Sequence, residues 1–568
     1  MAFSSTAPAN TVPAREPFGP LLFLVDRDKG PTDRLLSRWL FLRLLGAVYF
    51  SAFFALAFQV LGLVGSAGIQ PAFEFLTALR PLGSGAFWAA PSLLWWVHPN
   101  APAVDHALLA LVWVGLAASV LALANILPKP ALLVCFLCYL SFVTTAQDFA
   151  QYQSDGMLLE AGFLALFVAP SGLRPGWGRH SLASRAALFL LLWEWFRIYF
   201  ESGVVKLASG DPTWHNLTAM YEYYQNGPLP TWVGWYLQHA PLWFHRLTAG
   251  TTLVMELLLV WMAFAPRRWR YACFVLVSFW QIAVILTANY AFLNYLVLFL
   301  GVLLLDDRAL VRFVPQRWRT GLTPASPDTL THEADTPTGP SISAPTAPLA
   351  TRRIGSRRHP REVIRAARVA VTTILLAAVA YATTEPLLAM FWPTIPLPIA
   401  PVAALAPWRI ANTYGLFAVM TPHRYEIEFQ GSNDAQDWTA YPFRYKPQDP
   451  GDRPRIYAPY QPRFDWNLWF ASLTTWQQAP IVAGTEIRLL QGSEPVLGLF
   501  AANPFREQPP RFVRAVLWQY WFSTPREKHA SGLWWRRQYL GTYAPTLTRE
   551  PDGKFAATAL PEWNPAPQ

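Results

Sequence analysis

Residues 190–207 read Leu-Leu-Leu-Trp-Glu-Trp-Phe-Arg-Ile-Tyr-Phe-Glu-Ser-Gly-Val-Val-Lys-Leu. All but the last of them belong to an otherwise apolar run, 187–206, whose length matches the ~20 helical residues that cross ~30 Å of hydrocarbon. Glu194, Arg197 and Glu201 stand at positions i, i+3 and i+7, which places them on one face of a helix. The stretch therefore predicts a transmembrane helix that turns an acid, a base and an acid toward other protein segments.

Eight further apolar runs lie before and after this helix in the sequence. Together with it they predict about nine spans, with an uncertainty of about two, and three short runs are also compatible with re-entrant segments. The composition agrees, because 53% of the 568 residues are hydrophobic and 14% are charged, against about 25% charged residues in soluble domains. The eight runs are 44–65, 108–127, 131–146, 157–170, 247–265, 271–286, 291–305 and 369–391.

The distribution of Lys and Arg predicts the orientation of these spans. Basic residues gather in segments that alternate along the chain with segments lacking any base. The basic segments are 32–43, 171–186, 266–270 and 306–365, and the segments without Lys or Arg are 147–156 and 207–245. This alternation puts the N-terminus in the cytoplasm and everything after residue 391 outside. The net charge of +10 is then mainly a topology signal, and no nucleic-acid partner is predicted.

The fold class that follows is a polytopic α-helical membrane bundle followed by a small, mainly-β extramembrane domain. The first part is a cytoplasmic N-terminal segment with an interfacial helix over its last residues. A Pro-, Ser-, Thr- and Arg-rich stretch predicts a disordered cytoplasmic loop before the last span. The predicted parts are 1–43, a membrane domain 44–305 with an outer aromatic loop 207–246, the loop 306–368, the last transmembrane helix 369–391, the β-rich domain 400–550 and a tail 551–568.

Ionisable residues at membrane depth form a predicted intramembrane polar network. Each would cost ~2.5–3.5 kcal/mol at a helix centre if it faced lipid, so we expect them to pair inside the bundle. Two interpretations stay open: a structural network that fixes helix register, or a polar cavity that binds or reacts with a ligand. The network consists of Glu160, Glu194, Arg197, Glu201, Lys206 and Glu256.

Lys206 is the sharpest candidate for chemistry in this network. It ends its span at the outer interface, where a desolvated lysine could act as a base. The alternative is that its ammonium group extends to the lipid headgroups. Its position at the end of the span favours the headgroups.

No motif predicts a metal, a cofactor or a catalytic residue. The sequence contains no nucleophile elbow, no phosphate-binding loop and no dinucleotide-binding glycine pattern. Three histidines of the outer loop match no metal spacing, and three cysteines fall in predicted spans, where they act as small apolar side chains. These residues are His215, His239, His245, Cys135, Cys138 and Cys273.

The extramembrane domain shows the alternation of β-strands. Residues 424–430 and 438–445 flank a Gly-Ser-Asn-Asp turn and predict a hairpin. Further strands are expected at 485–491, 512–522 and 534–543. Short strands over this length predict a small mainly-β domain, sandwich-like in architecture.

Ten tryptophans lie from Trp408 onward, more than a core of this size needs. Core packing accounts for most of them, and some are expected on a surface that binds client proteins. Arg463 and Asp465 are interpreted as a structural ion pair in a tight turn. The candidates for client binding are Trp438, Trp466, Trp469, Trp534 and Trp535.

Several motifs together resemble those of the lipase maturation factor family, from about residue 44 to 545. They are Tyr152-Gln-Ser-Asp-Gly-Met-Leu-Leu-Glu-Ala-Gly-Phe-Leu-Ala165, Ser202-Gly-Val-Val-Lys-Leu207 with Trp214, Asn412-Thr-Tyr-Gly-Leu-Phe417, Gln430-Gly-Ser-Asn-Asp434, Ala458-Pro-Tyr-Gln-Pro-Arg-Phe-Asp-Trp466, Asn503-Pro-Phe505 and Gly532-Leu-Trp-Trp535. The resemblance implies an endoplasmic-reticulum type of membrane protein that helps lipases reach their active fold with its lumenal C-terminal domain. A more distant similarity of the segment around Lys206 to vitamin K-dependent carboxylase-like membrane proteins implies a lysine in an active site.

The sequence therefore supports two hypotheses. The first is a membrane-bound maturation factor that binds secreted or exported, lipase-like clients through its external domain, without covalent chemistry or a cofactor. The alternative is a membrane-embedded enzyme on a lipid- or quinone-like substrate, with Lys206 as base. The Pro/Ala/Arg-rich character of the 306–365 segment suggests a bacterial protein and hence an inner membrane, and the family resemblance implies the endoplasmic reticulum membrane for eukaryotic members. The bilayer is a partner in both cases, and the oligomeric state stays open.

Overall fold

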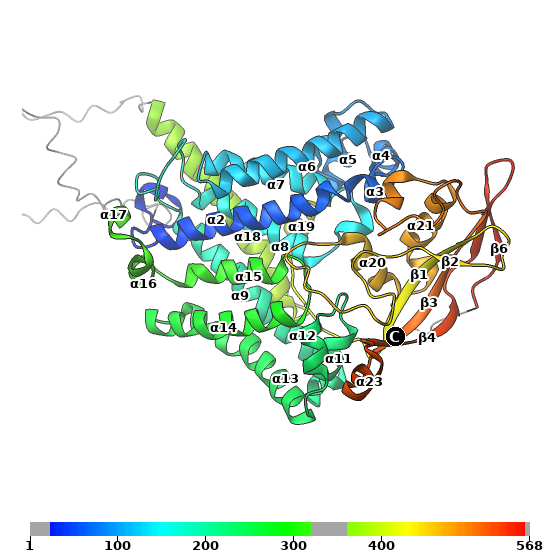
Figure 1. Cartoon of the computed structure of the whole chain (residues 1–568). Coiled ribbons are helices and arrows are strands. Elements are labelled where there is room, and N and C mark those ends of the chain that lie inside the picture. The colour runs from blue at the N-terminus through cyan, green and yellow to red at the C-terminus, as the bar shows by residue number, and fades with distance from the viewer. Residues whose placement is uncertain (1–22, 320–321, 323–359, 563–568) are drawn as a thin grey trace, which may run out of the picture.

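A helical bundle occupies the first part of the computed structural model, which describes residues 23–319, 322 and 360–562. Each predicted span falls on a helix of this bundle (Figure 1). These helices are α2 (Leu35–Ala57), α6 (Ala101–Leu123), α7 (Pro128–Val143), α8 (Gln153–Val168), α9 (Arg185–Ala208), α13 (Leu242–Leu257), α14 (Arg267–Thr287), α15 (Leu293–Gly301) and α18 (Pro360–Ala389).

Five helical segments of the described residues are long and apolar enough, by length and composition, to cross a membrane. α7, and α15 with the turn that follows it, are apolar but shorter, and α8 and α9 carry five of the six charged residues of the polar network. The number of spans therefore stays a prediction. The five segments are Leu35–Ala57, Ala101–Leu123, Leu242–Phe264, Arg267–Thr287 and Val363–Ala389.

The first long helix, α2, begins at Leu35 and ends at Ala57, whereas the sequence predicted a span over 44–65. The residues expected in an interfacial helix are thus the first turns of α2. Arg38 lies among them and is 1% exposed, because its guanidinium donates to the carbonyl of Ser181 at 2.8 Å. An arginine that finds acceptors inside the protein does not have to stay at the membrane surface.

Local signals explain where several helices begin. The side chain of Asn100 accepts the N–H of Ala103 at 2.8 Å, and that of Ser184 accepts the N–H of Ala187 at 3.4 Å. Pro128 opens α7, where its missing N–H costs no hydrogen bond. These residues fix the starts of α6, α9 and α7.

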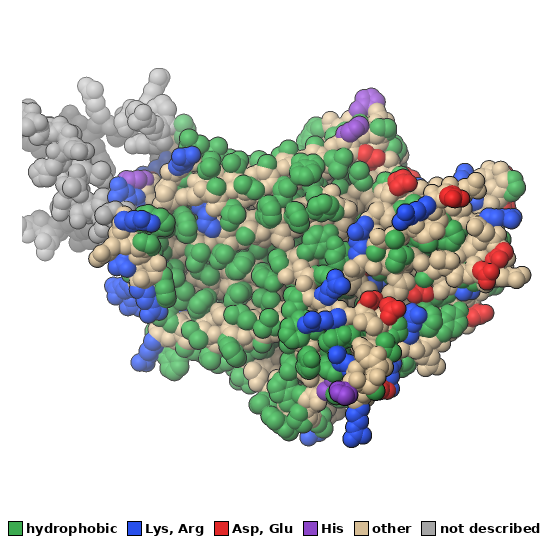
Figure 2. Space-filling model, in the orientation of Figure 1, with side chains coloured by type: hydrophobic (Ala, Val, Ile, Leu, Met, Phe, Trp, Pro, Cys, Tyr) green, Lys and Arg blue, Asp and Glu red, His purple; other side chains and the backbone are tan. Residues whose placement is uncertain are grey.

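The arginine-bearing segments gather at one end of the bundle, opposite the sheet (Figures 1 and 2). There Arg34 donates to the carbonyl of Leu303 at 2.7 Å and Arg27 to that of Leu182 at 2.8 Å. The segments that the charge pattern assigned to one side of the membrane therefore do meet.

The segment before the last span is described only in part. α16 (Asp307–Leu310) and α17 (Gln316–Arg319) follow α15. The predicted disordered loop falls largely on 320–321 and 323–359, which lie outside the described residues. The last helix then begins at Pro360 rather than at 369.

Short helices cover the end of the bundle that faces the sheet. The outer aromatic loop contains three of them. Two others, between α2 and α6, were not predicted. The three helices of the outer loop are α10 (Pro212–His215), α11 (Ala219–Asn226) and α12 (Trp232–Gln238). The two others are α4 (Ala72–Leu79) and α5 (Ser84–Ala89). In addition, α3 (Val60–Val64) directly follows α2, and α19 (Ala400–Leu405) follows α18.

The C-terminal part is built on one antiparallel sheet with the order β2-β1-β3-β5-β6, in which β4 also pairs with β3. β3 pairs along its length with β1, so that Ile427 lies opposite Leu517. Its other edge is shared by β4 and β5. The strands are β1 (Arg424–Ser432), β2 (Thr439–Ala440), β3 (Phe512–Phe522), β4 (Trp535–Thr542), β5 (Thr546–Arg549) and β6 (Phe555–Ala559).

Helices cover one face of this sheet, so the domain is a sheet with helices and not a sandwich of two sheets. α20 packs on β1 and α21 packs on β3. The helices of this domain are α20 (Arg463–Ala471), α21 (Pro480–Leu490), α22 (Glu494–Leu497) and α23 (Pro525–Ser531). One buried apolar cluster contains Ile427 and Phe429 of the sheet as well as Phe41 and Leu45 of the bundle, so the two parts share a core.

Three expectations about this domain were wrong in detail. Residues 485–490 of this expected strand belong to helix α21, in which the buried positions Ile481, Thr485 and Leu489 recur every four residues. The second hairpin strand is short, since Pro442 lacks the N–H that would continue the ladder. Part of the predicted tail forms β6 and completes the sheet.

Candidate functional site

The charged stripe of α9 faces the segment that leads from α18 into the sheet. Arg197 is fully buried, pairs with Glu160 of α8, and donates to the carbonyl of Asn412 at 2.5 Å. Glu201 lies 3.7 Å from Arg197 and accepts the backbone N–H of Tyr414 at 2.7 Å. The charges of the bundle are thus satisfied by backbone groups from far along the chain.

Glu160 is the centre of this cluster. Its Oε2 accepts the backbone N–H of Asn412 at 2.9 Å, the side-chain amide of Asn412 at 3.1 Å and the hydroxyl of Tyr414 at 2.9 Å. Gly156, one turn earlier on α8, leaves room for this segment, because a Cβ there would lie 2.6 Å from the Asn412 side chain. The motif 152–165, which contains Asp155 and Glu160, therefore packs against the motif 412–417.

Lys206 is buried and does not reach the headgroups, which corrects the expectation from its position in the sequence. Its Nζ lies 3.0 and 2.9 Å from the two carboxylate oxygens of Glu256 on α13. It also donates to the carbonyl of Leu416 at 2.7 Å and of Ser202 at 3.4 Å. The ring of Trp214 lies 5.2 Å away. The outer loop and the 412–417 segment cover this lysine, which hydropathy alone could not reveal.

Glu194 is the one network residue that the structure leaves out of these clusters. It is fully buried on α9, and it forms no ion pair within 4 Å among the residues that the structure describes. The other five form two groups, one around Arg197 and one around Lys206. No single centre joins all six.

A second buried arginine fastens the C-terminal domain to the bundle. Arg463, at the start of α20, contacts Asp155 of α8 through both terminal nitrogens, at 3.0 and 2.7 Å, and donates to the hydroxyl of Tyr139 at 2.8 Å. Its expected partner, Asp465, instead accepts the backbone N–H of Lys446 at 3.1 Å. The expected pair of Arg463 with Asp465 was therefore wrong, since the arginine points into the bundle.

A third contact joins the sheet to the outer loop. Arg424, fully buried at the start of β1, donates to the carbonyls of Gln225 and Pro228 at 3.1 Å each and pairs with Glu426. The domain consequently closes over one end of the bundle (Figure 1).

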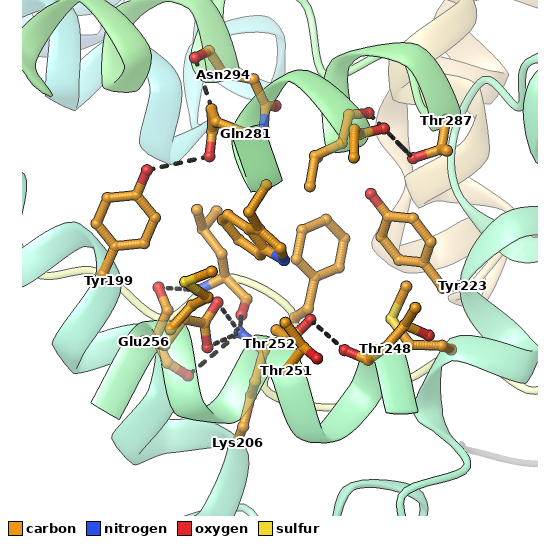
Figure 3. A pocket seen from close by; sticks show the side chains of 18 of the residues that line it. Tyr199, Lys206, Tyr223, Thr248, Thr251, Thr252, Glu256, Gln281, Thr287 and Asn294 are labelled. Carbon is orange, nitrogen blue, oxygen red and sulfur yellow. Dashed lines mark hydrogen bonds and ion pairs between the residues drawn. The ribbon is translucent and has the colours of Figure 1, made fainter. Parts of the chain in front are cut away.

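A cavity of about 380 Å³ lies beside the Lys206–Glu256 pair, between α9, α11, α13, α14 and α15. Its walls are mainly apolar and aromatic, and Figure 3 shows the polar side chains spread around its edge. Tyr199 donates to Gln281 at 3.1 Å on one side of it. Sequence patterns did not reveal this cavity, because residues from seven helices, α9 to α15, and from the 416–417 segment line it.

The tryptophans proposed for client contact do not form one exposed surface. Trp466, Trp469 and Trp535 are buried, and Trp535 packs against Phe522 with ring centroids 4.6 Å apart. Their burial leaves Trp438 and Trp534, which are partly exposed, as candidates for a preformed surface.

Among the described residues, no group of three or more His, Cys, Asp or Glu side chains is placed to hold a metal ion. Histidines of the outer loop contact backbone carbonyls instead: His239 meets that of Ser523 and His245 that of Ala240. The three cysteines are buried and free.

Sequence reasoning missed the residues that receive the buried charges. Asp155 and Tyr139 fall in or beside predicted spans, and Asn412 and Tyr414 entered only as part of a family-like motif. A signal was present, since a carboxylate and a hydroxyl at membrane depth need partners as much as Arg197 does. The buried charges that they meet on other segments are more than 200 residues away in sequence, and spacing cannot identify such pairs.

Comparisons with known proteins match both parts of the chain. The family model described as the lipase maturation factor transmembrane domain covers residues 36–312, and the one described as the lipase maturation factor C-terminal domain covers 410–545. Lipase maturation factor 2 of Mus musculus is 33% identical over 90% of this chain and 82% of its own length. Lipase maturation factor 1 of Bos taurus is 31% identical over 91% of this chain and 89% of its own length. No solved structure matches. With both domains matched in order, and with relatives above 30% identity along most of their length, the chain belongs to the lipase maturation factor family.

Proposed function

We propose that this chain is a membrane-bound maturation factor for exported, lipase-like client proteins. The observation that carries the proposal is the similarity to lipase maturation factors 1 and 2 across both the bundle and the C-terminal domain. The names of those relatives supply the client class. The mechanism is non-covalent shielding of client surface, because no motif for covalent chemistry occurs in the sequence.

The client surface that we propose is the arginine–aromatic face of the sheet, made of Trp438, Arg514, Trp518, Arg537 and Tyr539. It lies on the face that α20 and α21 do not cover. The guanidinium of Arg514 lies 4.0 Å from the Trp438 ring, and that of Arg537 lies 4.2 Å from the Trp518 ring. The ring of Tyr539, 43% exposed, lies 5.3 Å from that of Trp518.

The residue types of this face support a binding role. Trp, Tyr and Arg are the types that most often carry binding energy at protein interfaces. Stacking holds the guanidinium groups in place before a client arrives, which lowers the entropy lost on binding. The buried tryptophans of the first hypothesis, Trp466, Trp469 and Trp535, are not part of this face.

The test uses the full chain in membranes together with a co-expressed lipase that depends on a maturation factor. We expect the double variant Arg514→Ala/Tyr539→Ala to lower the yield of active secreted lipase about tenfold, as removal of an interface hot spot does. Arg536→Ala is the matched control, because Arg536 neighbours Arg537 on β4 but points to the other face and pairs with Glu527 at 3.6 Å. Equal lipase yields from both variants, at equal levels of the chain, would refute the proposed surface.

We further propose that the chain lies in the bacterial inner membrane or, in a eukaryotic cell, in the membrane of the endoplasmic reticulum. Its C-terminal domain then lies outside the cytoplasm. The support is the excess of Arg at the opposite end of the bundle (Figure 2), which favours the cytoplasmic side. A client on the export pathway would meet the arginine–aromatic face only in that orientation.

The enzyme alternative draws support from the cavity that opens onto Lys206. Against it stands the bonding of the ammonium group, whose protons have acceptors in Glu256, Leu416 and Ser202. A general base needs a free lone pair, so the geometry favours a structural cation. In the same lipase assay, the charge-free double variant Lys206→Met/Glu256→Met distinguishes the two: retained maturation supports the structural role, and lost maturation with normal folding supports catalysis.

A further inference from the structure

The cavity beside α9 opens sideways from the bundle. Leu247 of α13 and Phe279 of α14 line it, and their side chains are 59% and 79% exposed. Both helices lie in segments apolar enough to cross a membrane. What surrounds these exposed apolar side chains in a membrane is therefore the hydrocarbon of the bilayer, and the mouth of the cavity faces lipid.

The contacts of α14 show where the opening of the cavity lies. At one end α14 packs against the turn Leu259–Phe264 that follows α13, and at the other end against α12. Leu247 and Phe279 stay exposed between these two contacts. The opening therefore lies between α13 and α14, in the half of the bundle that is nearer the sheet.

The cavity has an apolar body and an uncharged polar edge. Lys206 and Glu256 neutralise each other at 2.9 Å, so they offer little net charge to a ligand. Gln281 donates to the backbone carbonyl of Asn294 at 3.3 Å. The side-chain oxygen of Asn294 is buried and accepts no hydrogen bond from any residue that the structure describes, although a buried polar atom normally has a partner.

We propose that this cavity binds an uncharged, single-chain lipid with a hydroxyl-bearing head, such as a monoacylglycerol, which enters from the bilayer between α13 and α14. In this proposal the acyl chain fills the space between the apolar and aromatic side chains, and the head donates a hydrogen bond to Asn294, one of the lining residues labelled in Figure 3. A volume near the lower end of the usual range for ligand pockets suits one chain better than two. This site is separate from the arginine–aromatic face, so it does not depend on the proposed client.

The experiment uses the full chain in phosphatidylcholine nanodiscs with a trace of a monoacylglycerol that carries a diazirine in its chain. Illumination, digestion and mass spectrometry then locate the labelled peptides. We expect labels on lining residues of α13, α14 and α15. An anionic fatty-acid probe with the same chain should label these peptides less, because the cavity offers no uncompensated cation.

Two variants on one helix make the test specific. Thr252→Trp places an indole in the cavity, since Thr252 lines it and is buried, and should lower labelling of the cavity peptides about tenfold through lost burial of the chain. Val254→Trp is the matched control, because Val254 is 44% exposed on the lipid-facing side and does not line the cavity. Its labelling should equal that of the parent.

Other results would overturn the proposal. The proposal is refuted if Thr252→Trp and the parent are labelled equally. It is also refuted if the labels are confined to lipid-facing residues, or if the anionic probe labels the cavity peptides more strongly. If Thr252→Trp does not elute as a folded, monodisperse protein, Thr251→Trp at the mouth replaces it. Asn294→Leu tests the head contact separately: it should weaken labelling by the monoacylglycerol and leave labelling by a plain hydrocarbon probe unchanged.

Discussion

At the residue scale, buried charges decide how this protein is held together. Arg197, Arg463 and Arg424 are each almost inaccessible, and each meets acceptors from a distant part of the chain. Removing one partner of a buried ion pair typically costs about 3–5 kcal/mol, because the other charge is left uncompensated. These arginines therefore act as fixed points between the bundle and the C-terminal domain.

Glu486 is a buried carboxyl of a different kind. It lies fully buried on α21, and it forms no ion pair within 4 Å among the described residues. Burial raises its pKa well above the usual range for glutamate. The folded protein therefore keeps a proton on Glu486 at a pH where the unfolded chain has lost it, and stability falls as the pH rises from about 4.3 toward the folded-state pKa.

Glu486→Gln should remove this loss of stability. Since glutamine has no proton to release, we expect the Tm of the variant to exceed that of the parent at about pH 8 and to match it near pH 4. Thermal unfolding of the detergent-solubilised full chain measures this. Glu494→Gln, at an exposed position of the same domain, is the control and should change the Tm at neither pH. A difference between Glu486→Gln and the parent that is independent of pH would contradict the explanation.

At the scale of elements, glycines set how closely the helices of the bundle approach. A Cβ at Gly203 of α9 would lie 2.8 Å from the side chain of Leu257 on α13. A Cβ at Gly162 of α8 would lie 1.9 Å from the hydroxyl of Tyr49 on α2. Small residues of this kind let membrane helices pack by close contact, which replaces the hydrophobic driving force that lipid cannot supply.

Gly162→Ala should therefore destabilise the bundle by about 1–3 kcal/mol, the usual cost of overpacking. Adding Tyr49→Phe should restore part of the loss, because it removes the hydroxyl that the new methyl group meets. The Tm of the purified full chain reports both effects. Gly250→Ala on α13, whose Cβ would have its nearest neighbour at 4.0 Å, should not lower the Tm. Equal effects of the two alanine variants would exclude this packing argument.

At the scale of the whole molecule, the C-terminal domain is part of one folded unit with the bundle. Arg463 and Arg424 find their partners in α8 and the outer loop, and the apolar cluster is continuous between the two parts. The sheet is therefore joined to the bundle by buried charges and by a shared apolar core. Leu416 and Phe417, from the segment that leads into the sheet, line part of the cavity.

An isolated fragment of residues 400–562 should not fold to its native state. Its arginines would lose their acceptors, and part of its apolar core would face water. We expect rapid cleavage in limited proteolysis, whereas the same segment in the full chain resists. A monodisperse, protease-resistant fragment with a dispersed amide spectrum would show that the domain is independent. For this reason, client binding is best measured with the full chain.

The sequence by itself determined the class of the protein, the approximate position of the nine bundle helices that coincide with predicted spans, the strands β1, β3 and β4, and five of the six charged residues that pair inside the bundle. These features depend on hydropathy, periodicity and charge, which add up over neighbouring residues. The tertiary structure alone decided that residues 485–490 lie in a helix, that Arg463 pairs with Asp155, and that Lys206 is buried beside a cavity. Each of these depends on which distant segments pack together, and local spacing carries no information about partners that lie hundreds of residues away.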